Sequence, residues 1–110
     1  MAVPELLLAK IRRFVADLAP VHVRDQLHYE AGVRGNNVTL VECRPPVEDA
    51  LAEWRMKIAQ LRYQPDAQLW TLYWADRNDR WHRYPDFEPT TVLDAVLREI
   101  EHDPLCVIFG

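Results

Sequence analysis

The sequence contains no serine, and this absence excludes every mechanism built on a serine nucleophile. Glycine is scarce as well: Gly32, Gly35 and Gly110 are too few and too scattered to form a loop that cradles phosphate groups. No apolar run approaches the roughly 18 residues that a membrane-spanning helix needs. The chain therefore lacks the signatures of serine hydrolases, phosphate-binding loops and membrane helices.

Cysteine is nearly absent, with only Cys43 and Cys106, which form no Cys-x-x-Cys pair. Both lie among apolar or strand-like residues, so we expect buried free thiols and not a disulfide. The apolar run Leu6–Leu8 is followed by basic residues, the reverse of the charge order of a secretory signal peptide. We therefore expect a cytoplasmic protein with no membrane association.

The charges are unevenly distributed along the 110 residues. The net charge of −4 disfavours a protein that meets nucleic acid or an anionic membrane with its whole surface. Residues 57–84 nevertheless hold five basic residues (Lys and Arg) and three acidic residues (Asp and Glu). Residues 85–110 hold one basic and six acidic residues. The sequence predicts a mildly basic middle and an acidic end, which most often means solvated faces.

Apolar spacing predicts two main helices and five or six strands. Leucine, isoleucine and valine recur every three or four residues after Pro4 and again after Thr91, the spacing of a helix with one buried face. Thr91 with Asp94 three residues later also resembles a capping box. In chain order we expect a helix from Pro4 that ends before Pro20, strands at 27–33 and 38–43, a short helix at 47–56, strands at 58–63, 69–75 and 80–84, a helix from Thr91, and a strand at 105–109.

The connections between the strands are short, which favours antiparallel hairpins. Arg34–Asn37 forms one turn and Asp76–Asp79 another, and a tight turn of this kind requires positive φ, here at Asp79 or Asn78. The predicted fold class is α+β: a single domain, 1–110, with a mainly antiparallel sheet of five to six strands packed against an N-terminal and a C-terminal helix.

The Trp-rich run at 59–63 and 70–84 resembles the bacterial domain of unknown function family 3024. Further similarity covers nearly the whole chain and lies at His22–Asp25, Val38–Leu40, Arg44–Pro46 and Asp103–Gly110. Asp79 stands where the family often has glycine. The resemblance implies a small stand-alone bacterial domain, and it brings no agreed activity, cofactor or catalytic residue.

The aromatic hairpin at 69–84 is the most distinctive feature. Trp70, Leu72 and Trp74 share one face of the strand, and Tyr73 lies on the other. A three-residue turn places Trp74 opposite His82 and Tyr73 opposite Arg83, whereas a four-residue turn pairs Trp74 with Trp81. In either register one face enters the core and the other carries Tyr with Arg or His.

Catalytic and metal chemistry find little support in the sequence. His82, with Asp76 across the turn, has the residue types of an acid–base pair, but no candidate nucleophile has a recognisable spacing. No His or Cys pair has metal-ligand spacing, so a metal site requires distant segments to come together. The carboxylates Glu99 and Asp103, near the end of the last helix, are expected on a solvated face. We expect no cofactor, no catalytic residue, and no metal required for folding.

A non-enzymatic interaction module is the leading functional hypothesis. The Tyr/Arg face would bind a partner protein, since Tyr and Arg dominate interface energetics. Single-stranded nucleic-acid binding by the same face is the alternative, and an enzyme of unknown class comes third. We expect a monomer or weak homodimer. The candidate binding residues are Arg62, Tyr63, Tyr73, Arg77, Arg80, His82 and Arg83.

Three observations separate these hypotheses. A protein-binding face should be apolar at its centre. A face that binds nucleic acid should do so with a steep salt dependence. An enzyme needs a concave pocket with converging polar groups.

Overall fold

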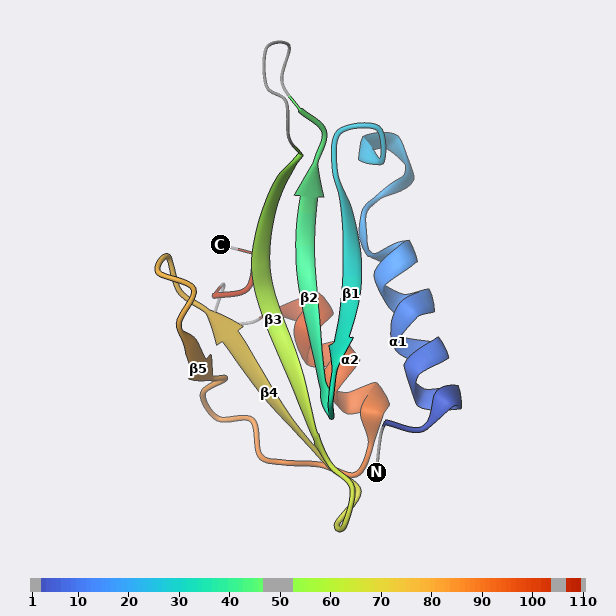
Figure 1. Cartoon of the computed structure of the whole chain (residues 1–110), viewed down its shortest axis with the longest axis vertical. Coiled ribbons are helices and arrows are strands. Elements are labelled where there is room, and N and C mark those ends of the chain that lie inside the picture. The colour runs from blue at the N-terminus through green and yellow to red at the C-terminus, as the bar shows by residue number, and fades with distance from the viewer. Residues whose placement is uncertain (1–2, 47–52, 104–106, 110) are drawn as a thin grey trace.

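The computed structural model describes residues 3–46, 53–103 and 107–109, and these form two helices on an antiparallel sheet (Figure 1). The five strands follow one another in the order β1-β2-β3-β4-β5, each antiparallel to the next. The α+β prediction is confirmed. The elements are α1 (Glu5–Leu18), a 3₁₀ turn η1 (Val21–Val23), β1 (His28–Arg34), β2 (Asn37–Arg44), β3 (Trp54–Gln64), β4 (Leu69–Ala75), β5 (Trp81–Arg83) and α2 (Leu93–His102).

The β1–β2 hairpin is set by a two-residue turn. Arg34 pairs with Asn37, and Gly35 adopts φ +60°, the left-handed conformation that glycine enters without steric cost. From this turn the register runs back to His28 opposite Cys43. The predicted hairpin is therefore confirmed, together with its turn.

The β4–β5 hairpin has the three-residue turn that the sequence left as one of two possibilities. Trp74 lies opposite His82 and Tyr73 opposite Arg83. Asp79 adopts φ +60°, as predicted, and its N–H donates to the carbonyl of Asp76 at 3.0 Å. A non-glycine residue in this conformation costs roughly 1–2 kcal/mol, which the closure of the hairpin offsets.

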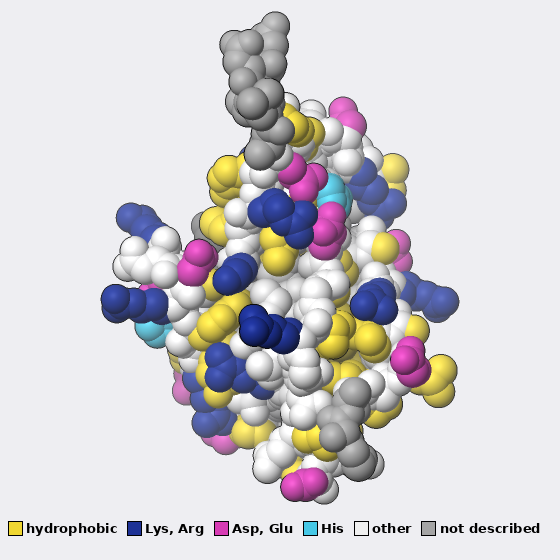
Figure 2. All heavy atoms as spheres, in the orientation of Figure 1, with side chains coloured by type: hydrophobic (Ala, Val, Ile, Leu, Met, Phe, Trp, Pro, Cys, Tyr) yellow, Lys and Arg dark blue, Asp and Glu magenta, His cyan; other side chains and the backbone are white. Residues whose placement is uncertain are grey.

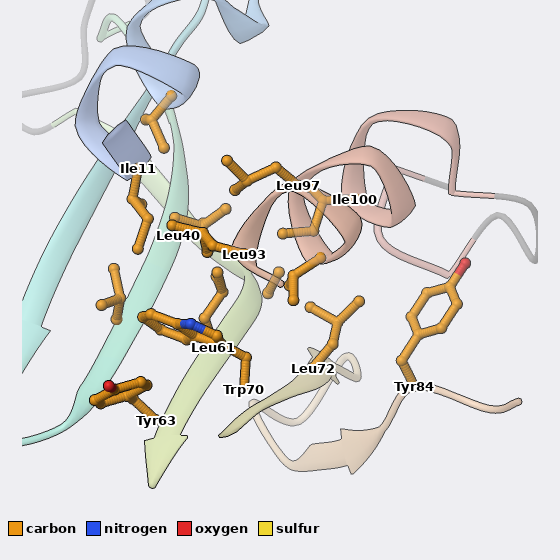
Figure 3. Close-up of a cluster of buried hydrophobic side chains, with 14 of the residues drawn as sticks. Ile11, Leu40, Leu61, Tyr63, Trp70, Leu72, Tyr84, Leu93, Leu97 and Ile100 are labelled. Carbon is orange, nitrogen blue, oxygen red and sulfur yellow. The ribbon is translucent and has the colours of Figure 1, made fainter. Parts of the chain in front are cut away.

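The hydrophobic core fills the space between the helices and one face of the sheet (Figure 3). Each buried Leu, Ile or Phe contributes roughly 1.5–3 kcal/mol, so this layer holds the helices on the sheet. The predicted stripe of α2 is buried, and so are Ile11 and Val15 of α1. The main contributors are Ile11, Val15, Leu40, Leu61, Trp70, Leu72, Leu93, Val96, Leu97 and Ile100.

Two predicted elements differ from the structure. Residues 47–52 of the predicted short helix lie outside the described residues, and Trp54–Met56 belong to β3 instead. Leu105 and Cys106 of the predicted final strand also lie outside them, and residues 107–109 form no strand. The sheet accordingly has five strands in the described part of the chain. The predicted capping box is wrong too, because the N-cap of α2 is Val92 and no side chain caps the helix.

Asp103 explains why residues 107–109 are not a strand. It ends α2 in the left-handed conformation, is only 5% exposed, and accepts hydrogen bonds from the backbone N–H groups of Val107, Ile108 and Phe109 at 3.2, 2.9 and 2.8 Å. The Tyr84 hydroxyl donates to the same carboxylate at 3.0 Å. The prediction of a solvated Asp103 is therefore wrong. A carboxylate that captures three successive N–H groups leaves them no bond for a sheet ladder.

Cys43 is a free, fully buried thiol, as predicted, and Cys106 lies outside the described residues. None of the helices in the described ranges is both long enough and apolar enough to cross a membrane.

Candidate binding surface

The face of the sheet that the helices leave uncovered carries a row of polar and basic side chains. Because side chains alternate along a strand, residues in register share a face across neighbouring strands. Thr39 pairs with Gln60, Gln60 with Tyr73, and Tyr73 with Arg83, so the row crosses four strands. We call this surface the open face.

Arg62 and Tyr73 form the centre of the open face. The Arg62 guanidinium lies 3.8 Å from the centroid of the Tyr73 ring, a cation–π contact. Its Nε donates to Gln60 at 2.7 Å, and the Gln60 amide donates to the Thr39 hydroxyl at 2.9 Å. Gln60 is only 8% exposed. The chain of contacts holds the guanidinium in one orientation before any ligand arrives.

The charge of the open face is locally positive. By register, Lys57, Arg62 and Arg83 all project from it. Within the described ranges Lys57 and Arg62 form no ion pair, and Arg83 has only a long contact of 3.9 Å with Glu88, which is 91% exposed. Figure 2 shows Lys and Arg side chains over the middle of the sheet, with Asp and Glu mostly around it and toward its upper end. The basic middle predicted from the sequence thus becomes a basic surface.

The structure brings three of the seven predicted site residues together, namely Arg62, Tyr73 and Arg83. Tyr63 belongs to the opposite face, where it is 8% exposed and packs on Trp70 with ring centroids 4.6 Å apart. It pairs with Trp70 in register, so both enter the core. A sequence reveals the alternation within each strand but not which residues of β3 lie opposite those of β4.

The remaining candidates, Arg77, Arg80 and His82, lie around the β4–β5 turn and not on the open face. Arg77 and Arg80 are exposed residues of the turn itself. His82 alternates with Arg83 and stacks on Trp74 on the helix side of the sheet, with ring centroids 4.7 Å apart.

His82 and Asp76 do meet, as their sequence positions suggested. The His82 Nε2 lies 2.7 Å from the Asp76 carboxylate. The other oxygen of Asp76 accepts N–H bonds from Asn78 and Arg80 at 2.8 and 3.0 Å. The hydrogen bond to His82, followed by that from the Arg80 N–H, lowers the pKa of Asp76 from 3.8 to about 2. A carboxylate so fully engaged with its own turn organises the hairpin, and an acid–base role finds no support here.

A cleft of about 720 Å³ lies between α1 and α2. Charged side chains of both signs line it, among them Lys10 and Asp94, which form an ion pair. Tyr29 also borders it, and burial, followed by the charge of Glu42, raises the pKa of this phenol to about 12. No serine, cysteine or histidine is present among its described lining residues.

Sequence reasoning missed a group of possible metal ligands on the open face. His28, Glu30, Cys43 and Glu53 gather where β1, β2 and the start of β3 lie side by side. A signal for part of this group was present, because a two-residue turn between Arg34 and Asn37 already places His28 opposite Cys43.

Comparison with known proteins identifies the family and nothing more specific. The family model described as "Domain of unknown function (DUF3024)" matches residues 2–110, so the chain belongs to this family, as the Trp-rich run predicted. No curated protein and no solved structure matches the chain.

Proposed function

We propose that this member of the DUF3024 family binds single-stranded nucleic acid on its open face. The observation that carries the proposal is the oriented Arg62 guanidinium, stacked on Tyr73 and free of any carboxylate partner in the described part of the chain. The outer side of a guanidinium plane can stack on a base. Its remaining N–H groups can donate to a phosphate.

The polar centre of the open face favours this candidate over a protein partner at the same place. The sequence favours a protein partner, whose binding face should be apolar at its centre. Thr39, Gln60 and Arg62 occupy that centre together with Tyr73, whose ring the Arg62 guanidinium covers, and Lys57 lies beside them. Lysine is depleted at the centre of protein interfaces but is well suited to a phosphate backbone.

The net charge of −4 does not oppose local binding. The acidic residues of α2 lie on the other side of the sheet, whereas Glu88 of the preceding loop lies 3.9 Å from Arg83, and the smallest dimension of the molecule is 24 Å. Charges separated by more than about 8 Å are largely screened at physiological ionic strength. A nucleic-acid strand on the middle of the open face meets Lys57, Arg62 and Arg83, while Glu30 and Glu53 lie at one end of that face and are paired with Arg55.

Fluorescence anisotropy with a labelled mixed-sequence single-stranded oligonucleotide tests the proposal. Each phosphate neutralised adds about 0.7 to the slope of log affinity against log salt, so three contacts predict a slope near 2. Affinity should then fall roughly 20-fold between about 50 and about 200 mM salt. Arg62→Ala and Arg83→Ala should each lower the slope by under one unit. Tyr73→Ala should weaken binding through the lost support for Arg62.

Arg12→Ala is the matched control, since it removes the same charge from an exposed position on α1, on the covered side of the sheet. It should leave the slope unchanged. Dissociation constants weaker than about 100 µM at physiological salt, the weak end of non-specific binding, would refute the proposal. Equal losses in Arg12→Ala and Arg62→Ala would place the binding elsewhere.

A protein partner remains the second candidate, at a different place. β4 pairs only with Ala59–Gln64 of β3. The segment Trp54–Ile58 therefore has β2 on one side, and its other edge has no neighbouring strand in the described part of the chain. Trp54 and Met56 of this segment are 46% and 42% exposed. An extended segment of another protein can add to such an edge through backbone hydrogen bonds, with Trp and Met as apolar anchors.

A photoreactive phenylalanine analogue at position 54 tests this second candidate in cells. It should form an adduct with a specific protein, and Met56→Lys should abolish that adduct. The same analogue at Leu6, an apolar side chain on α1 that is 86% exposed, is the control. Absence of an adduct, or the same adduct from both positions, would count against a partner at this edge.

A further inference from the structure

One end of the open face holds four side chains that commonly bind transition metals. His28 on β1 is the direct cross-strand neighbour of Cys43 on β2, and Glu30 follows His28 on the same face. Cys43 in turn lies opposite Arg55, and Glu53 precedes Arg55 by two residues. The donor atoms of the two glutamates, the imidazole and the thiol all lie within 4.8 Å of one another.

The spacing of these donors is close to that of a tetrahedral zinc site. Zinc bonds of 2.0–2.3 Å place the ligand atoms of a tetrahedron about 3.3–3.8 Å apart. The four donors therefore need to approach by about 1.5 Å at most. Side-chain rotations supply this, because His28, Glu30 and Glu53 are all partly exposed.

The mixture of donors separates this group from an ordinary acidic patch. Clusters of carboxylates alone suit magnesium or calcium, whereas thiolate with imidazole selects zinc and neighbouring transition metals. Cys43 is fully buried, yet on this face of the sheet its neighbours are the polar and charged His28, Glu30 and Arg55.

A cation already occupies the space between the two carboxylates. The Arg55 guanidinium donates to Glu30 and to Glu53, each at 2.9 Å, while His28 lies 2.8 Å from Glu30. Hydrogen bonds from His28 and then Arg55 lower the pKa of Glu30. The Arg55 side chain is 47% exposed, and surface ion pairs of this kind are weak enough for a divalent ion to displace it.

We propose that His28, Glu30, Cys43 and Glu53 bind one Zn²⁺ ion through an imidazole nitrogen, a thiolate sulfur and two carboxylate oxygens. Arg55 then turns outward and remains as a counter-charge to the anionic ligands. Without metal, burial and the nearby Glu30 charge raise the pKa of the Cys43 thiol, so metal binding releases a proton from it. The site lies outside the hydrophobic core, so the chain folds without the ion and gains stability from it.

Titration of the full-length protein with Co²⁺, a spectroscopic substitute for zinc, tests the site. Tetrahedral coordination should produce strong visible bands, and the thiolate should add a sulfur-to-cobalt charge-transfer band in the near ultraviolet. Both should saturate at one ion per chain and disappear when Zn²⁺ is added. In a separate thermal melt, Zn²⁺ should raise the melting temperature of the metal-free protein.

Matched variants assign the ligands. Cys43→Ser should abolish the charge-transfer band, and His28→Ala, at a partly exposed position, should weaken Co²⁺ affinity by at least about 10-fold while the protein remains folded. His22→Ala, which removes an imidazole outside the group, should leave both signals intact. A charge-transfer band that persists in Cys43→Ser, equal affinities of His28→Ala and His22→Ala, or no tetrahedral spectrum would overturn the proposal. These outcomes are independent of oligonucleotide binding.

Discussion

Two loops of this protein are each organised by one aspartate, and the two aspartates differ in burial. Asp103 is 5% exposed and binds the segment 107–109 together with the Tyr84 hydroxyl. Asp76 is partly exposed and binds the N–H groups of its own turn together with His82. Both carboxylates accept several hydrogen bonds, so their bonding alone does not distinguish them.

The difference lies in what replaces the carboxylate when it is lost. Water can reach the donors around Asp76, so their hydrogen bonds are exchanged at small net cost. The donors around Asp103 include the buried N–H of Ile108, and a buried donor without a partner costs about 1–3 kcal/mol. Loss of the carboxylate should therefore destabilise the protein far more at the end of α2 than at the β4–β5 turn.

The largest expected effect is that of Asp103→Ala. Removing the acceptor of four hydrogen bonds should destabilise the protein by about 3 kcal/mol or more, because the buried N–H of Ile108 and three further donors lose their acceptor. Asp103→Asn, which keeps the size and tolerates the left-handed backbone, should cost less than Asp103→Ala. Urea denaturation measures both. If Asp103→Ala lowered the free energy of unfolding by less than about 1 kcal/mol, burial would not explain a difference in stability contribution between Asp103 and Asp76.

Tyr84→Phe should have the next largest effect. It removes only the hydroxyl that donates to Asp103 at 3.0 Å and leaves the buried ring in place. Because the acceptor is charged, the loss should be about 1.5–3 kcal/mol. Measured together with Asp103→Ala in a double-mutant cycle, it should show strong coupling. Additive losses would mean that the hydroxyl and carboxylate act independently.

Asp76→Asn should destabilise the protein less than Tyr84→Phe at neutral pH. The pKa of Asp76 is about 2 in the folded protein against 3.8 for the free side chain, so the carboxylate stabilises the fold above about pH 4. This contribution is lost as the pH falls from about 4 to about 2. Denaturation of both proteins across this range should therefore show a smaller difference at the acidic end. A difference that does not change with pH would contradict the assigned cause.

The smallest effect is expected for Asp79→Gly. Asp79 holds φ +60° in the turn that Asp76 organises, and glycine adopts this conformation without steric cost. The substitution should stabilise the protein by a few tenths to about 1 kcal/mol in thermal melts. The same change at Asn78, which has no positive φ, is the control and should not stabilise. A destabilised Asp79→Gly would mean that the aspartate side chain matters more than its backbone.

The open face shows which side-chain positions local sequence patterns predict and which they do not. The alternation of residues 69–75 correctly separates the core side chains Trp70 and Leu72 from Tyr73. It carries no information on β3, whose pairing with β4 puts Tyr63 in the core and Arg62 on Tyr73. The extra residue that shifts the β2–β3 register near Leu40 has no signature in the sequence either.

The sequence by itself determined the two helices, the two hairpins and the buried stripes, because period, turn residues and proline positions act over a few residues. Only the tertiary structure decided the burial of Asp103, the meeting of Arg62 with Tyr73, and the grouping of His28 and Glu30 with Cys43 and Glu53. Each of these depends on which strand or loop lies beside another. Which strand or loop lies beside another depends on packing over the whole core, and no single segment of the sequence determines that packing free energy.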